Sequence, residues 1–187
     1  MMKTAVLLIW AGAQLAAQEE FVPMKKGRKW VYKQGDSEFV QTVAGTEKVG
    51  SVECFVLQSE VSGQKESMWI AVNAEGSWLH KIRSGEVVSE LPKPAQLLKY
   101  PMNKGDRWDA RVPSGDLVIE YQFENAGQEE VEVAAGKYQA WTIKMKGMAS
   151  GQEFSGTYWY AKGVGLVRQK ISSKRGEFLI ELKEVKE

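Results

Sequence analysis

Two side chains capable of nucleophilic or acid–base chemistry occur only once in this sequence. His80 is the single histidine and Cys54 the single cysteine of the 187 residues. A nucleophile–histidine pair needs a third group that orients the imidazole, and neither residue lies in a flanking motif typical of such a site. His80 lies on the strand face opposite Leu79, which favours a surface histidine. Cys54 begins an apolar run, which favours a buried, inert thiol.

The acidic residues and glycines give no catalytic or metal-binding motif. Glu130 and Glu132 alternate with valines, as in a strand with one solvated face. A glycosidase needs two carboxylates facing each other across a cleft, and no such pair is marked here. The Gly163–Gly165 segment precedes no helix, so a tight turn is favoured over a phosphate-binding loop. We therefore predict no catalytic residues, no metal site and no cofactor.

Aromatic residues are the remaining candidates for a binding site. Strand alternation places Trp159 on one face and both Tyr158 and Tyr160 on the other. If Trp159 faces the core, the two tyrosines line the opposite surface, and such aromatic surfaces suit sugars, lipids or peptides. We therefore predict Tyr158 and Tyr160 as ligand-binding residues, with simple packing as the alternative.

The sequence contains two copies of one motif. Residues 23–30 (PMKKGRKW) match residues 101–108 (PMNKGDRW) at Pro, Met, Lys, Gly and Trp, with an offset of 78 residues. Further matches follow in the same order, and the offset grows to 90 at Trp69 and Trp159. We predict repeat one over residues 21–83, a connector over 84–99 and repeat two over 100–187. The predicted structural residues of the repeats are Gly27, Trp30, Trp69, Gly105, Trp108, Trp159, Gly163 and Gly165.

Each copy is patterned as β-strands. Apolar and polar residues alternate over 117–124, 141–146 and 178–183, and glycine turns separate such runs at hairpin spacing. The pattern predicts an all-β fold: an antiparallel curved sheet or half-open barrel built from two repeated meanders, after an N-terminal signal helix. Each copy has room for about five or six strands and is small for independent folding, so residues 18–187 are expected to form one domain. Pro92 and Pro94 mark the connector as an edge or crossover segment.

The N-terminus has the pattern of a secretory signal peptide. Lys3 precedes the apolar stretch 4–13, which is too short to span a bilayer, and small residues follow at Ala16 and Ala17. Cleavage after residue 17 leaves 24 basic and 24 acidic residues, which argues against nucleic acid as a partner. No cysteine near the cleavage point offers a lipid attachment site. We expect a soluble extracytoplasmic chain, periplasmic or secreted, with no lipid anchor and no integral membrane segment.

Three segments of the second copy carry a family resemblance. They are Tyr100-Pro101-Met102-x-x-Gly105-x-x-Trp108, residues 133–138 (VAAGKY) and residues 158–167 (YWYAKGVGLV). The series resembles uncharacterised exported bacterial families of unknown function, over most of residues 99–187 and more weakly in the first copy. Such families look distantly like the half-open β-barrels of periplasmic lipoprotein carriers and related lipid-binding proteins. That likeness concerns the fold.

These observations favour an exported, non-enzymatic β-sheet protein that binds an apolar or amphipathic ligand such as lipid. The alternative is a structural or interaction protein of the cell envelope with no small-molecule ligand, in which a partner protein binds at a sheet edge. An enzyme is a third hypothesis, and it would depend on His80 or Cys54. An open apolar cavity would favour the first hypothesis, and a filled core the second.

Overall fold

The computed structural model describes residues 21–61, 63–114 and 117–187, so the predicted signal peptide lies outside the described residues. Every regular element in the described residues is a β-strand, which confirms the all-β prediction. The strands are β1 Lys29–Gln34, β2 Ser37–Val49, β3 Val52–Val61, β4 Gln64–Asn73, β5 Gly76–Ser84, β6 Val87–Lys99, β7 Arg107–Ser114, β8 Leu117–Val133, β9 Gly136–Ala149, β10 Gln152–Ala161, β11 Gly165–Ser173 and β12 Gly176–Lys186.

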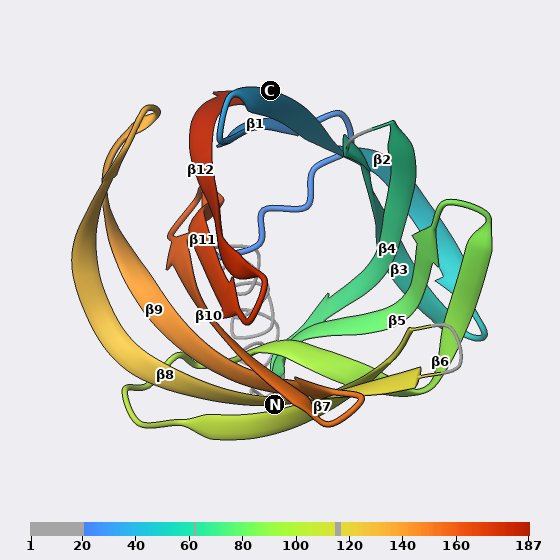
Figure 1. Cartoon of the computed structure of the whole chain (residues 1–187). Coiled ribbons are helices and arrows are strands. Elements are labelled where there is room, and N and C mark those ends of the chain that lie inside the picture. Colours follow the sequence, from blue (N-terminus) through green and yellow to red (C-terminus); the bar gives the residue numbers. More distant parts are fainter. Residues whose placement is uncertain (1–20, 62, 115–116) are drawn as a thin grey trace, which may run out of the picture.

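The strands form one antiparallel sheet that curls into a nearly closed ring. Its order is β6-β5-β4-β3-β2-β1-β12-β11-β10-β9-β8-β7, so consecutive strands are neighbours and β1 pairs with β12. The sheet ends at β6 and β7, the strands on either side of the midpoint of the chain. Figure 1 shows the resulting ring, with the segment before β1 running inside it. The predicted half-open barrel is confirmed.

The two halves of the sheet, β1–β6 and β7–β12, repeat the same backbone geometry. The Gly27 N–H donates to the Val43 carbonyl at 2.9 Å, and the Gly105 N–H donates to the Asn125 carbonyl at 2.7 Å. Gly27 and Gly105 have φ angles of 90° and 91°, a region that favours glycine because it has no Cβ. The sequence match between the halves is therefore accompanied by matching turns and hydrogen bonds.

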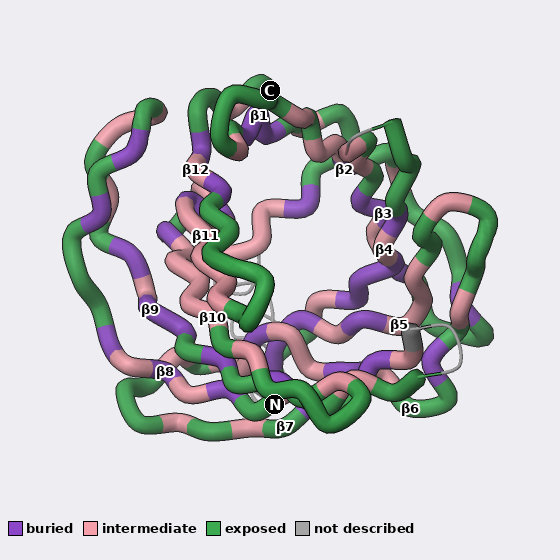
Figure 2. The backbone as a smooth tube through the Cα atoms, in the orientation of Figure 1, coloured by how far each residue is buried: buried purple, intermediate pink, exposed green. Residues whose placement is uncertain are grey.

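The main core lies on the inner face of the curled sheet, where buried residues from both halves meet (Figure 2). Met24 of the segment before β1 packs into this core, and Phe21 lies with its ring centroid 6.3 Å from that of Tyr100. Cys54 belongs to a smaller cluster around Trp69 and is fully buried, as predicted. His80 is half-buried on β5, and this burial lowers the pKa of its imidazole.

Candidate functional site

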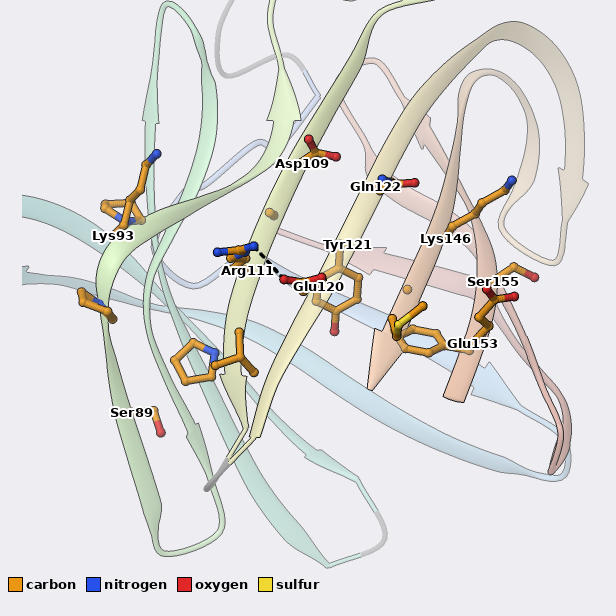
Figure 3. Close-up of a pocket in the computed structure, with 18 of the residues that line it drawn as sticks. Ser89, Lys93, Asp109, Arg111, Glu120, Tyr121, Gln122, Lys146, Glu153 and Ser155 are labelled. Atoms are coloured by element: carbon orange, nitrogen blue, oxygen red, sulfur yellow. Dashed lines mark ion pairs between the residues drawn. The ribbon is translucent and has the colours of Figure 1, made fainter. Parts of the chain in front are cut away.

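A groove lies where the sheet fails to close. Its volume is about 1590 Å³, and its lining comes from β6 and β7 at the sheet ends and from β8–β11 beyond them. Figure 3 shows Ser89 and Lys93 of β6 across from Arg111, Glu120 and Tyr121. We call the gap between β6 and β7 the open seam, and the hollow along it the seam groove.

Prolines keep the two sheet ends from pairing. Pro92 and Pro94 lie in β6 and Pro113 lies in β7, and proline has no N–H to donate to a ladder. The pairing of β6 with β5 also jumps at this point, because the partner of Leu79 is Ala95 whereas the partner of Lys81 is Glu90. Residues 91–94 therefore bulge out of the ladder. The prediction of an edge or crossover segment is resolved in favour of an edge.

The backbone of β7 faces the groove at alternate residues. Pro113 is opposite Val118 in the β7–β8 ladder, and because Pro113 lacks an N–H, this pair is one that exchanges no hydrogen bonds. Alternation then directs the backbone groups of Arg111 and Asp109 towards the seam. The groove is thus bordered by free peptide groups as well as by side chains.

In the part of the chain that the structure describes, the side-chain contacts that fasten the open seam lie at one end. The Trp108 Nε1–H of β7 donates to the Gln96 carbonyl of β6 at 3.2 Å. Lys99 Nζ lies 3.6 Å from Asp106 Oδ1 near the same end. Both contacts lie beside the β6–β7 connection, so the groove is closed there and open towards the hairpins at the opposite rim of the barrel.

The floor of the groove is aromatic and apolar. Ala110 is opposite Tyr121 in the ladder, and the Tyr121 and Phe154 rings meet edge to face with centroids 5.9 Å apart. Gly147 lies beneath Phe154, and a Cβ at Gly147 would overlap that ring. A small residue at 110 and a glycine at 147 therefore make room for the two rings and for the space above them.

The charged lining residues of β7–β10 alternate with the residues of this apolar floor and lie on the other face of the sheet. Arg111 Nη2 and Glu120 Oε1 form an ion pair of 2.8 Å on the groove wall (Figure 3). Lys93 and Lys146 add positive charge, and the acidic lining residues are Glu90, Asp109 and Glu153 besides Glu120. A groove with an apolar floor and charged walls of both signs suits a ligand with an apolar part and a polar part.

Tyr158 and Tyr160 lie on the inner face of the barrel, outside the lining of the groove. Tyr158 is opposite the buried Ile143, and the two tyrosine rings stack with centroids 6.5 Å apart. Burial raises the pKa of both hydroxyls. Their expected surface position depended on Trp159 facing the core, and Trp159 occupies the opposite face among polar partners. A role of Tyr158 and Tyr160 in ligand binding stays a prediction.

Trp159 and its repeat counterpart Trp69 make the same contact. Trp159 Nε1 donates to Glu129 Oε1 at 2.7 Å, and Trp69 Nε1 donates to Glu47 Oε2 at 2.8 Å. The Thr142 hydroxyl also donates to Glu129. The hydrogen bond from Thr142, and to a smaller extent the one from Trp159, lower the pKa of the Glu129 carboxyl. Strand alternation gave no sign of these bonds, because the partner lies on a different strand.

The first tryptophan of each copy contacts a backbone carbonyl. Trp30 Nε1 donates to the Val164 carbonyl at 2.6 Å, in the turn that carries Gly163 and Gly165. Gly165 has a φ of 103°, and a Cβ there would lie 3.5 Å from Trp30 Nε1. Gly165 therefore lets the chain pass close to the indole, and the element that follows the turn is strand β11 and not a helix.

Residues 21–61, 63–114 and 117–187 hold neither a metal cluster nor a membrane-spanning helix. No three His, Cys, Asp or Glu side chains in these ranges gather as a metal site. No helix within them has the length and hydropathy needed to cross a bilayer.

Sequence reasoning missed the groove, although two signals for it were present. One was the pair of prolines in the connector, which marked an edge but not a cavity. The other was a difference between the copies: at the offset of 78 residues, Tyr32 of the first copy corresponds to Ala110 of the second. The small side chain of Ala110 leaves space in the second copy that the large side chain of Tyr32 fills at the equivalent position of the first copy.

Comparison with known proteins places the chain beside uncharacterised exported proteins. Residues 120–180 match the model of a family described as DUF3108-like, and no curated protein matches the chain. A protein of Bacteroides fragilis described as exported, with a YmcC-like fold, has 16% identity and a TM-score of 0.59 over 90% of this chain and 99% of its own. A protein of Parabacteroides distasonis described as a lipoprotein has 15% identity and a TM-score of 0.56 over 89% and 98%. The predicted resemblance to uncharacterised exported families is confirmed.

Proposed function

We propose that this protein is an exported, non-enzymatic binding protein whose seam groove holds an amphipathic ligand such as a lipid. The observation that carries the proposal is an apolar, aromatic-floored groove that three prolines keep open at the place where the sheet would otherwise close. The floor would take the apolar part of the ligand, and the charged walls its polar part.

The size and composition of the groove support a ligand larger than a metabolite. Its volume of about 1590 Å³ exceeds the range of roughly 300–1,000 Å³ usual for small-molecule sites. The walls carry both charge signs, which suits a zwitterionic or weakly charged head group better than a strongly anionic one. His80 and Cys54 are absent from the lining, so neither borders a ligand in this groove.

An extracytoplasmic location is part of the proposal. Residues 1–17 have the pattern of a cleaved signal peptide, and the two structural relatives are described as an exported protein and a lipoprotein. We propose that this chain itself has no lipid anchor, because no cysteine lies near the expected cleavage point.

Titration of the purified protein with a fluorescent phospholipid analogue below its micelle concentration tests the groove. Gln122→Trp is the blocking variant, because Gln122 is an exposed lining residue beside the charged side chains, where an indole would occupy space needed by the polar part of the ligand. Val40→Trp is its control, at the equivalent exposed position of the first copy. We expect saturable binding that Gln122→Trp weakens about tenfold or more and Val40→Trp leaves unchanged.

Two results would overturn the proposal: no probe binding by the unaltered protein, or equal binding by both variants. Mass spectrometry of protein purified from its native host gives a separate measurement, in which we expect a co-purifying lipid.

The second candidate function is that of an envelope interaction protein. It is favoured by the free peptide groups of β7, since an unpaired edge can accept a strand from a partner. In-cell crosslinking from a photoreactive residue at Asp109 distinguishes the candidates. Adducts with one protein, together with no probe binding, would favour this second function.

A further inference from the structure

Large apolar side chains are exposed mainly at one rim of the barrel. In an up-and-down meander, the turns after β1, β3, β5, β7, β9 and β11 all lie at the same rim, which we call the hairpin rim. Of the nine exposed large hydrophobic residues in the described part of the chain, only Val52 lies at the opposite rim, and Val40 lies a few residues into β2. The other seven flank the turns: Val87 and Val88 of β6, Leu117 and Val118 of β8, Met148 of β9, and Phe178 and Leu179 of β12.

These seven residues, which we call the apolar arc, surround the mouth of the seam groove. In the order of strands around the barrel, the hairpins that carry them follow one another from β5–β6 across the open seam to β11–β12. Val88, Val118 and Met148 are also lining residues of the groove. The groove therefore opens onto the apolar arc, and its closed end is at the other rim, where Trp108 contacts Gln96.

Charge at the end of the arc indicates what it contacts. The β11–β12 turn places Lys174 and Arg175 side by side, and two residues separate them from Phe178 and Leu179. Within the described residues, neither cation takes part in an ion pair, whereas the nearby Glu177 is neutralised by Lys170 at 2.7 Å. The β9–β10 turn, Ser150–Gly151, carries no charge. Exposed apolar residues beside unpaired cations complement an anionic lipid surface, with the apolar side chains in the interfacial region and the cations at the phosphates.

We propose that the apolar arc, with Lys174 and Arg175, docks the protein on the surface of an anionic phospholipid bilayer, with the mouth of the seam groove facing the lipid. The inference rests on the proposed function of the groove, because docking would let an amphipathic ligand pass between the bilayer and the groove without crossing water. The mature chain has no net charge, so the attraction is local to this hairpin.

Flotation with vesicles of about 7:3 phosphatidylcholine to phosphatidylglycerol tests the proposal. We expect the unaltered exported chain to float with the vesicles. Phe178→Ser combined with Leu179→Ser should lower the partition coefficient about tenfold. Val52→Ser, at the opposite rim, is the matched apolar control and should change nothing.

A second pair of variants tests the charge. Lys174→Glu combined with Arg175→Glu should lower partitioning onto anionic vesicles about tenfold. Binding to pure phosphatidylcholine vesicles should be weak, and the double substitution should not change it. Lys48→Glu, an exposed lysine beside the β2–β3 turn, is the control at the opposite rim. Raised salt should weaken the binding of the unaltered chain.

Probe titration separates failure of this inference from failure of the proposed function. Arc variants should keep their affinity for the soluble phospholipid analogue, and the groove variant Gln122→Trp should still float with vesicles. Probe binding without flotation would overturn the docking inference alone. The inference would also be overturned if sedimentation showed a dimer that the Phe178 and Leu179 substitutions dissociate, because the arc would then contact a second copy.

Discussion

The barrel has two seams that join its halves, and only one of them is closed. At the closed seam, β1 pairs with β12 from Lys29↔Lys186 to Lys33↔Glu181, with one bulge. At the open seam, the corresponding strands β7 and β6 form no ladder. Both seams are fastened at the same end by a tryptophan, Trp30 on the Val164 carbonyl and Trp108 on the Gln96 carbonyl.

An ion pair beside each tryptophan has its charges exchanged. Arg28 of the first copy lies 2.8 Å from Glu187 at the closed seam. Asp106, the counterpart of Arg28, lies 3.6 Å from Lys99 at the open seam. Each seam thus carries a tryptophan contact and an ion pair at the same end, although Trp30 reaches past β12 to the β10–β11 turn. The two seams differ in the rest of each strand pair.

A few side chains account for this difference between the seams. Tyr32 fills the inner face at the closed seam, where its ring stacks on Phe39 with centroids 5.4 Å apart. Its counterpart Ala110 leaves the equivalent space beside Tyr121 unfilled. Prolines 92, 94 and 113 remove donors at the open seam, and β1 and β12 contain none. Small volume and missing donors therefore convert a ladder into a groove without a change of topology.

The largest expected effect comes from emptying the closed seam. Tyr32 is 2% exposed, so Tyr32→Ala leaves a cavity and should cost about 3–5 kcal/mol of the free energy of unfolding. Tyr121→Ala is the comparison, since its half-buried ring already borders the groove, and it should cost less than half as much. Urea denaturation measures both. Equal losses would mean that the two seams do not differ in packing.

A backbone substitution tests the difference in hydrogen bonding. Lys33 of β1 and Arg111 of β7 are exposed basic residues related by the offset of 78 residues. β1 has a ladder on both sides, so Lys33→Pro removes a hydrogen bond and should cost about 3 kcal/mol. The N–H of Arg111 faces the open seam, so Arg111→Pro should cost about 1 kcal/mol or less. The free energy of unfolding is again the measurement, and a large loss from Arg111→Pro would place a hydrogen bond at the open seam.

The features predicted from the sequence were those that depend on local patterns. Alternation over 117–124 and 178–183 lies in β8 and β12, and the prolines of the connector marked an edge strand. The motif around Gly27 and Gly105 indicated the common turn, because glycine at positive φ has a local cause.

The groove depends on residues that are far apart in the sequence. It requires β6, β7 and β10 to meet around one space, and pairing of β1 with β12 sets which ends remain free. Strand alternation predicts that Trp159 and its neighbours Tyr158 and Tyr160 lie on opposite faces of the sheet. It does not predict which of the two faces is the inner one. In the structure, Trp159 lies on the same face as Glu129 of another strand and donates a hydrogen bond to it.

The paired tryptophan–glutamate contacts allow a smaller test of how alike the halves are. Glu129→Gln and Glu47→Gln each weaken a hydrogen bond to an indole, and each should cost about 1 kcal/mol at neutral pH. Glu129 also accepts a hydrogen bond from Thr142, so its substitution should cost somewhat more. Chemical denaturation of the two variants in parallel gives the difference, and a smaller loss at Glu129 would contradict it.

The pH dependence of the same variant gives a second measurement. The pKa of Glu129 is lowered in the folded protein, so its carboxylate stabilises the fold above the pKa of the unfolded state. That contribution is lost as the pH falls through the lower, folded-state pKa. The difference in the free energy of unfolding between the unaltered protein and Glu129→Gln should therefore become smaller as the pH is lowered from neutral to about pH 3. A gap that stays constant would exclude the carboxylate charge as its source.

The smallest expected effects compare two tyrosine hydroxyls, one at each seam. Tyr32 Oη donates to the Leu166 carbonyl at 3.0 Å, so Tyr32→Phe leaves a buried acceptor short of a partner and should cost about 1 kcal/mol. Tyr100 Oη, near the fastened end of the open seam, is buried and has no hydrogen-bond partner among the described residues. Tyr100→Phe removes a group that is desolvated without compensation, so it should leave stability unchanged or raise it by up to about 1 kcal/mol. Thermal and urea unfolding of the two variants in parallel supply the measurement, and a loss at Tyr100 as large as that at Tyr32 would show that its hydroxyl has a partner in solution.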